Sequence, residues 1–149
     1  MTLTIRRPEA RDQRAWSTLW TAYLAFYHTE VAEDVHQTTF GRLIDVDVAD
    51  YAGFIAEDDE GPLGIVNYIT HRHGWRIENV VYLQDLYVDP RARGTGAGRA
   101  LIEAVYRAAD SAGTPTVYWL TQQGNDTARR LYDRIAEPTD FIKYQRGRR

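Results

Sequence analysis

The segment from Val80 to Gly113 constrains the fold of this chain more than any other, because it reads as a strand, a glycine-rich turn and a helix in direct succession. Residues 80–88 are mostly β-branched, aromatic or aliphatic, which is typical of a buried strand. Pro90 removes a ladder donor and ends that strand. Three glycines then fall within residues 94–98, and apolar residues continue at helical spacing to Gly113, the expected C-terminal cap. A helix that starts at such a turn presents unpaired N–H groups and the positive end of its dipole, so the segment predicts an anion-binding site.

The spacing of the glycines separates this site from two other phosphate sites. No Gly-Lys-Ser/Thr follows, so the turn is not a P-loop. The strand lies mid-chain, and no acidic-ended second strand follows at the distance that a dinucleotide fold needs. Arg91 and Arg93 offer positive charge to a pyrophosphate. A plain strand-to-helix loop remains the alternative.

Two motifs stand out in the sequence. The first is Leu86-Tyr87-Val88-Asp89-Pro90, then Arg93-x-x-Gly96-x-Gly98, then Leu101-Ile102. The second follows the next expected strand: Asn125-x-x-Ala128-x-x-Leu131-Tyr132. The first motif resembles the acetyl-CoA signature of the GNAT N-acetyltransferases, the second resembles a pattern of the same family, and the resemblance covers nearly the whole chain. The resemblance implies a single domain over residues 1–149, of the α/β class with α+β layering. Its mixed, twisted central sheet would have about six to seven strands flanked by about four helices.

The resemblance also implies where acetyl-CoA, the acyl-donor substrate, would bind. Backbone groups of the central strand would hold the pantetheine arm, at Leu86, Tyr87 and Val88. The glycine turn would hold the pyrophosphate, through Arg93, Gly94, Thr95, Gly96, Ala97 and Gly98. The second motif would add Asn125 and Tyr132. The backbone N–H of Val88 would stabilise the oxyanion. The Tyr132 hydroxyl would donate a proton to the departing thiolate, although a core tyrosine on an apolar helix face would show the same pattern.

The candidates for the general base lie in the central strand. Residues 82–88 resemble the central strand of diamine and polyamine acetyltransferases and of a yeast histone/polyamine acetyltransferase subgroup. Those relatives commonly have Glu-Asp where this chain has Gln84-Asp85, and glutamine cannot usefully accept a proton. Strand alternation sends Asp85 to the opposite face from Gln84. Asp85 could still act if the strand bulges, or through water; otherwise it would anchor the amine or serve the structure.

The acceptor amine is expected near the end of the first helix. Residues 16–27 carry aromatic and aliphatic side chains at helical spacing, so that helix should run to about residue 26. Core packing explains most of these aromatics, but Tyr23 or Tyr27 could line a substrate pocket. His28 and Glu30 are further candidates for substrate contact, together with Asp85.

The remaining elements follow from shorter patterns. Strands are expected over residues 3–6, 54–57, 63–70, 116–121 and 141–144, with Gly64 as a mark of a bulge. Thr38-Thr39 is expected to cap a second helix, and Asn125 or Asp126 a last one.

Composition narrows the function classes. The chain has no cysteine, hence no thiol nucleophile or acyl-cysteine, and no metal site is expected. Its net charge of −3 gives no reason to expect nucleic-acid binding, and its arginine-rich C-terminus is expected to be solvated. No apolar run approaches a membrane span and the N-terminus lacks the apolar core of a signal peptide, which together suit the cytoplasm.

The sequence therefore predicts acetyl-CoA-dependent acetylation of a primary amine by direct attack in a ternary complex. A small di- or polyamine is the expected acceptor, with a peptide or protein lysine or an amino acid as the alternative. A non-catalytic acyl-CoA-binding module, motivated by Gln84, and a nucleic-acid-directed acetyltransferase are the rival classes. A homodimer through the apolar C-terminal segment is left open.

Overall fold

The computed structural model describes residues 2–147. The chain forms two compact units, one ending at Trp119 and the other beginning at Leu120. The first unit contains, in chain order, β1 (Thr4–Arg6), the 3-10 turn η1 (Ala10–Asp12), α1 (Gln13–Phe26), α2 (Glu33–Ile44), β2 (Tyr51–Asp58), β3 (Gly61–His71), β4 (Val80–Val88), η2 (Pro90–Ala92), α3 (Ala97–Ser111) and β5 (Val117–Tyr118). The second unit contains α4 (Asp126–Ile135).

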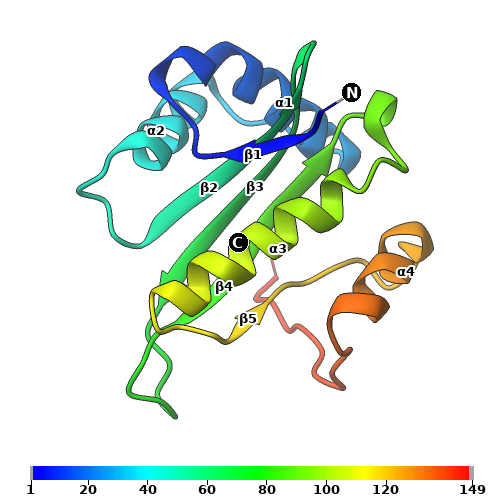
Figure 1. Ribbon diagram of the computed structural model, residues 1–149. Coiled ribbons are helices and arrows are strands. Elements are labelled where there is room, and N and C mark those ends of the chain that lie inside the picture. The colour runs from blue at the N-terminus through cyan, green and yellow to red at the C-terminus, as the bar shows by residue number, and fades with distance from the viewer. Residues whose placement is uncertain (1, 148–149) are drawn as a thin grey trace. The chain divides into compact units, whose positions relative to one another are not determined.

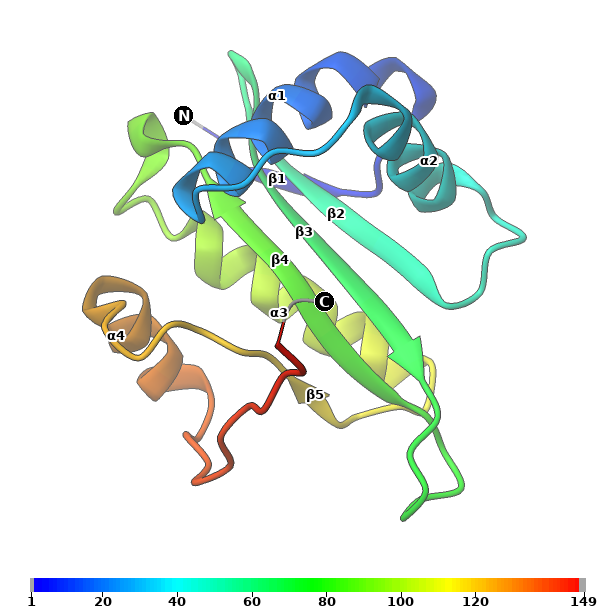
Figure 2. The ribbon, with the colours of Figure 1, turned by 180° about the vertical axis from the view of Figure 1, so that it is seen from behind.

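The strands of the first unit form one mixed sheet in the order β1-β2-β3-β4-β5. Strands β1 to β4 pair antiparallel, and β5 pairs parallel to β4 because α3 crosses over between them. Helices α1 and α2 cover one face of this sheet and α3 covers the other (Figures 1 and 2).

The sheet has five strands within the described residues, fewer than the six to seven that the sequence predicts. Strand β5 holds only two residues of the expected 116–121 run, and residues 141–144 form no strand. A strand needs a hydrogen-bonded neighbour as well as β propensity, and propensity alone does not supply one.

The core beneath α1 and α2 is rich in aromatic side chains. Trp16 and Trp20 stack with ring centroids 5.0 Å apart, and Phe40 packs against Trp16 at 5.5 Å. The buried cluster that these rings belong to consists of Trp16, Leu19, Trp20, Phe40, Leu43, Ile55 and Ile65. The aromatic spacing of the first helix is thus mainly a packing signal, as expected.

Helix α2 begins at Glu33, so the prediction that Thr38-Thr39 caps it is wrong. Glu33 and Asp34 occupy its first turn, where negative charge is stabilised by the helix dipole. Both threonines lie inside the helix, because the buried Phe40 and Leu43 hold the whole amphipathic segment against the sheet.

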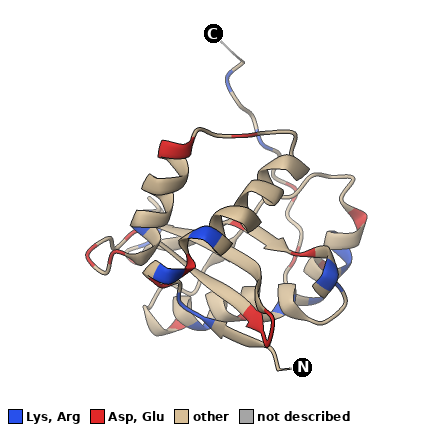
Figure 3. Cartoon of the chain, turned by 90° about the horizontal axis from the view of Figure 1, so that it is seen from above, with Lys and Arg blue, Asp and Glu red and all other residues tan. Residues whose placement is uncertain are grey.

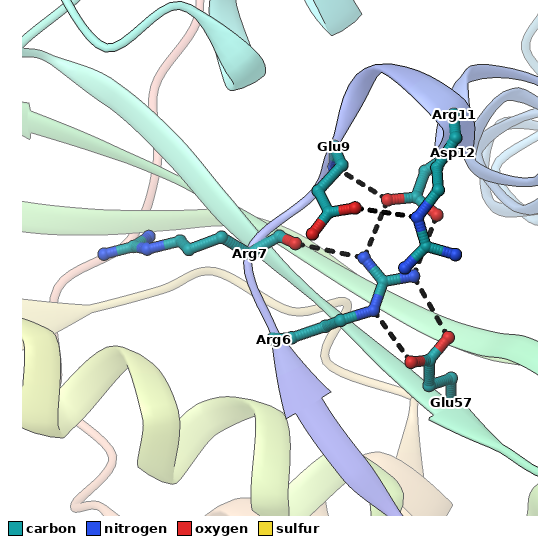
Figure 4. A network of polar contacts seen from close by, with 6 residues as sticks. All are labelled: Arg6, Arg7, Glu9, Arg11, Asp12 and Glu57. Atoms are coloured by element: carbon teal, nitrogen blue, oxygen red, sulfur yellow. Dashed lines mark hydrogen bonds and ion pairs between the residues drawn. The ribbon is translucent and has the colours of Figure 1, made fainter.

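A network of charged side chains joins β1, η1 and β2 (Figure 4). The Arg6 guanidinium donates to both carboxylate oxygens of Asp12, at 2.7 and 2.8 Å, and to both of Glu57, at 2.8 and 3.0 Å. Asp12 is only 4% exposed. This network fixes the start of α1 relative to the sheet, and α1 in turn carries side chains of the candidate site.

Charge is spread along the chain: basic and acidic segments are interspersed along the ribbon (Figure 3). No helix within residues 2–147 combines the length and apolar character that crossing a bilayer requires. Over the same range, no three His, Asp or Glu side chains converge in a way that could hold a metal ion.

Candidate functional site

A β-bulge interrupts β4 at Gln84. Leu83 pairs with Tyr68 of β3 and Asp85 pairs with the adjacent Asn67, which leaves Gln84 without an opposite residue. Tyr68 and Asn67 are neighbours and point to opposite faces of the sheet. The bulge therefore places Asp85 on the face of Asn67, beneath α1, while Gln84 is exposed. The sequence allows Asp85 to act as the general base if its strand bulges, and β4 does bulge at Gln84.

Asp85 is 5% exposed, and its carboxylate accepts hydrogen bonds from Trp20 and Asn67. Trp20 Nε1 donates to Oδ2 at 3.2 Å, and Asn67 Nδ2 donates to the same oxygen at 3.0 Å. No lysine, arginine or histidine of the described chain makes an ion pair or hydrogen bond with it. Burial raises the pKa of Asp85, and the hydrogen bonds from Asn67, Tyr23 and Trp20 oppose that rise. A buried carboxylate without a cation is an uncommon arrangement and marks a candidate functional group.

The charge of this carboxylate contributes to raised pKa values of several tyrosines. The Tyr23 hydroxyl donates to the Gln84 carbonyl oxygen at 3.4 Å. Burial raises the pKa of Tyr23, and both the charge of Asp85 and a hydrogen bond to it add to the rise. Burial also raises the pKa values of Tyr27 and Tyr51, with a further contribution from the Asp85 charge. The side chains around Asp85 thus combine negative charge with aromatic faces, which suits a cationic or amine ligand.

The predicted acceptor contacts are only partly brought together. Tyr27 is half-buried and packs edge-on against Tyr23 with ring centroids 5.2 Å apart. His28 and Glu30 are exposed, and within residues 2–147 no hydrogen bond or ion pair joins either of them to Asp85. His28 follows Tyr27, the C-cap of α1, and has a φ of 57°, in the left-handed region. Roles for His28 and Glu30 in binding an acceptor stay predictions.

Strand β4 extends well beyond the two residues at which it pairs with the parallel strand β5. Pairing between β4 and β5 is confined to Val81 with Val117 and Tyr82 with Tyr118. Beyond that point Leu86, Tyr87 and Val88 are half-buried and, among residues 2–147, form strand pairs only with β3. An extended ligand could bind backbone groups on that side of β4, and the contact of these three residues with a pantetheine arm stays a prediction.

The glycine turn leads directly into α3. Gly94 and Gly96 have φ values of 81° and 84°, which favour glycine, and Gly96 is the N-cap of the helix. The α3 hydrogen-bond ladder begins with Ala100 N donating to Gly96 O at 2.9 Å. The N–H groups of the first three helical residues, Ala97, Gly98 and Arg99, therefore have no acceptor inside the helix. This arrangement fits the pyrophosphate of an acyl-CoA.

The two arginines of the turn differ. Arg91 donates to Asp58 and to Glu60, at 3.1 Å each, so its charge is already partnered. Arg93 is exposed and has no ion pair within the described residues. Of the two, Arg93 is the one placed to meet an anion.

The second unit carries the other motif. Asn125 is the N-cap of α4, but its side chain makes no capping bond and donates instead to Thr121 Oγ1 at 3.4 Å. Tyr132 lies half-buried within α4. The roles of Asn125 beside the pantetheine and of Tyr132 as proton donor stay predictions.

Sequence reasoning missed three residues that contact or surround Asp85. Trp20 was assigned to the core alone, and Asn67 and Tyr51 were not singled out. Asn67 did carry a signal, because it is a polar residue inside an otherwise apolar strand and is 1% exposed. A buried amide needs partners, and Asp85 is the one that it finds.

A family profile and two curated sequences match this chain. The profile of the Acetyltransferase (GNAT) family matches residues 12–136. The D-amino-acid N-acetyltransferase HPA3 of Saccharomyces cerevisiae is 41% identical over 146 residues, covering 97% of this chain and 91% of that protein. The uncharacterized N-acetyltransferase YhfO of Bacillus subtilis is 26% identical over 144 residues, covering 95% of each chain.

A solved structure shares the fold. AAC(6')-Iy in complex with a bisubstrate analogue, CoA-S-monomethyl-acetylneamine, superposes with a TM-score of 0.85 over 99% of both chains, at 22% identity. The matched profile spans most of the chain, and it includes α1, the glycine turn and α4. This protein therefore belongs to the GNAT family of acetyltransferases.

Proposed function

We propose that this protein transfers the acetyl group of acetyl-CoA to the primary amine of a small acceptor, by direct attack in a ternary complex. One observation carries the proposal: β4 holds the buried carboxylate of Asp85 at its bulge and leads, beyond its end, into the glycine turn at the start of α3. A single strand thus connects a group suited to an amine with a turn suited to a pyrophosphate.

Acyl transfer also needs a donor for the oxyanion and a proton for the thiolate. The backbone N–H of Val88, near the end of β4, is proposed as the oxyanion donor. Tyr132 of α4 is proposed as the acid that protonates the sulfur. Both roles come from the resemblance to the family, and each is open to substitution or to backbone analogues.

Two acceptor classes have separate support. A di- or polyamine suits the buried carboxylate of Asp85, which has no cationic side chain paired with it. An amino acid is supported by the similarity to HPA3, whose name describes a D-amino-acid N-acetyltransferase. The carboxylate of such an acceptor would need a positive partner. Arg42 of α2 is one candidate, since its charge lowers the pKa of Tyr51 while burial and the charge of Asp85 raise it.

The test is release of CoA thiol from acetyl-CoA by purified protein, with a panel of amines. The panel holds putrescine, spermidine, D- and L-amino acids, an aminoglycoside and a lysine peptide, and mass spectrometry identifies the acetylated product. Amine-dependent release supports the proposal, and saturable acetyl-CoA binding with no release from any amine would instead support a binding module. Arg42→Ala should raise KM for amino acids and leave KM for diamines unchanged.

A homodimer is proposed on separate grounds. Phe141, Ile142 and Tyr144 are 83%, 74% and 89% exposed, which is unusual for three large apolar side chains within four residues. A second copy of the chain would cover them. Light scattering should then give twice the monomer mass, and replacing Phe141 and Ile142 by serine should return the monomer. A cytoplasmic location remains a prediction from the sequence.

A further inference from the structure

A polar cavity of about 420 Å³ lies between α1 and α2. Five residues of α1 and two of α2 line it, and its volume falls in the range of about 300–1,000 Å³ that is typical of small-molecule sites. Trp20 and Asn67, which hold the Asp85 carboxylate, are not among the lining residues. The cavity is therefore a second candidate site, separate from the buried carboxylate.

A hydrogen-bonded serine and histidine line this cavity. Ser17 of α1 and His36 of α2 are joined by a bond of 2.7 Å between Ser17 Oγ and His36 Nδ1. His36 is 8% exposed and packs edge-on against Trp20, with ring centroids 5.0 Å apart. Within residues 2–147, the other ring nitrogen of His36, Nε2, makes no hydrogen bond. The two side chains thus fix a polar surface where the helices meet, and Nε2 is left for a group that enters the cavity.

The two helices run antiparallel beside the cavity. Trp16 packs against Phe40 with ring centroids 5.5 Å apart, and Trp20, one turn later in α1, packs against His36, one turn earlier in α2. The start of α1 therefore lies opposite the later turns of α2, and the start of α2 lies opposite the later turns of α1. Lining residues from the two helix starts consequently approach the cavity from opposite ends.

Two of these lining residues, Arg14 and Glu33, carry opposite charges. Arg14 is the second residue of α1 and Glu33 the first of α2, and both are exposed. Within the described chain, neither charged group takes part in an ion pair. The cavity thus has an unpaired cation at one end and an unpaired anion at the other. A ligand with a single charge would meet an unfavourable group at one end, whereas a ligand with both charges meets a complementary group at each.

We propose that the α1–α2 cavity binds an elongated zwitterion, whose carboxylate meets Arg14 and whose ammonium group meets Glu33. The positions of these residues at opposite ends require several bonds between the two charges of the ligand. Thr18 and Thr21 also line the cavity, and their hydroxyls already donate to the carbonyl oxygens of Arg14 and Ser17, at 3.0 and 2.8 Å. Both hydroxyls therefore offer acceptor lone pairs to the N–H groups of a ligand. The inference goes beyond the proposed function, because this binding needs no acyl transfer.

The experiment is an NMR titration of the protein with 6-aminohexanoate, hexanoate and hexylamine, which share a chain length and differ in their charged ends. The resonances of Ser17 and His36 should shift with 6-aminohexanoate, which should bind about two- to fivefold more tightly than either singly charged probe, as expected for one exposed ion pair. Arg14→Ala should remove its advantage over hexylamine, and Glu33→Gln its advantage over hexanoate. Asp34→Asn is the matched control, because Asp34 lies in the same first turn of α2 but does not line the cavity.

The same titration of Asp85→Asn separates this cavity from the acceptor site. An unchanged dissociation constant for 6-aminohexanoate would support binding between α1 and α2, whether or not the protein turns over an amine. Equal affinity for the three probes, or shifts around Asp85 that the variant abolishes, would overturn this proposal and leave the proposed function intact. An effect of Asp34→Asn as large as that of Glu33→Gln would also count against it, because it would indicate a general effect of charge at the helix start. Absence of amine-dependent turnover would overturn the proposed function alone.

Discussion

Trp20 of α1 donates its indole N–H to Oδ2 of Asp85 across 3.2 Å, and this bond joins the aromatic core to the bulged strand β4. The bond binds the helix to the sheet and at the same time fixes one oxygen of a buried carboxylate. A side chain of the packing core thus also orients the group at the centre of the candidate site.

Asp85→Asn should abolish much of the activity without weakening the fold. An asparagine can present its oxygen to Trp20 and Asn67, and it removes a buried charge that has no cation. The folded-state pKa of Asp85 is raised, so the charged carboxylate disfavours folding once the pH exceeds its unfolded pKa. Urea unfolding should therefore show Asp85→Asn at least as stable as wild type at about pH 8, with the difference vanishing at about pH 3. A variant that is much less stable at the higher pH would show that the charge stabilises the fold.

Arg93→Ala should weaken acetyl-CoA binding selectively. Arg93 is exposed beside the glycine turn and has no ion pair in the described chain, whereas Arg107 lies exposed far along α3. Loss of one charged contact to a phosphate should raise KM for acetyl-CoA by about 5- to 20-fold, and KM for the amine should not change. Arg107→Ala is the control and should behave as wild type in the same assay. Equal effects of the two substitutions would contradict a pyrophosphate site at the turn.

Gly53→Ala should destabilise the protein because β2 and β3 approach closely there. An added Cβ would lie 2.5 Å from the Val66 carbonyl oxygen and 3.0 Å from Asn67 Oδ1. The expected loss is about 1–3 kcal/mol of unfolding free energy, as in other overpacked cores. Gly41, inside α2, has open space around it, and Gly41→Ala should instead gain about 0.5–1 kcal/mol from helix propensity. Chemical denaturation of both variants measures the contrast, and a Gly53→Ala protein as stable as Gly41→Ala would show that this approach is not tight.

The Arg6 network should make stability fall at low pH. Hydrogen bonds from Arg6 lower the pKa of Asp12 in the folded state. Ionised Asp12 therefore contributes fully to the free energy of unfolding above its unfolded-state pKa of about 3.9. That contribution is lost as the pH falls through the lower pKa that Asp12 has in the folded state. Asp12→Asn should cost about 1–3 kcal/mol at neutral pH and progressively less below about pH 3. Urea unfolding as a function of pH measures this loss of stability. Glu9→Gln is the control, because Glu9 forms an exposed ion pair with Arg11. A penalty for Asp12→Asn that does not depend on pH would contradict this account.

The parts that the sequence predicted well are local ones. The strand Val80–Val88, the glycine turn and the helix from Ala97 to Ser111 are each determined by neighbours along the chain. The left-handed φ of Gly94 and Gly96 requires no distant partner, so the residue types alone indicated a turn.

The parts that escaped prediction depend on contacts across the fold. The face on which Asp85 lies follows from the bulge at Gln84, and that bulge exists only in the register between β3 and β4. Asn67 and Trp20 reach Asp85 from 18 and 65 residues away in sequence, a pairing that no local pattern reveals. Two other predictions failed for the same reason. Packing against the sheet sets the start of α2 at Glu33, and residues 141–144 form no strand because β propensity alone does not supply a hydrogen-bonded neighbour.

The most direct test of the account is the rate of CoA-thiol release with saturating acetyl-CoA and an accepted amine, measured for wild type and Asp85→Asn. The account predicts amine-dependent release by wild type and a fall in kcat of about 100- to 1000-fold in the variant, with acetyl-CoA binding unchanged. An Asp85→Asn protein that turns over as fast as wild type would contradict the central role given to the buried carboxylate.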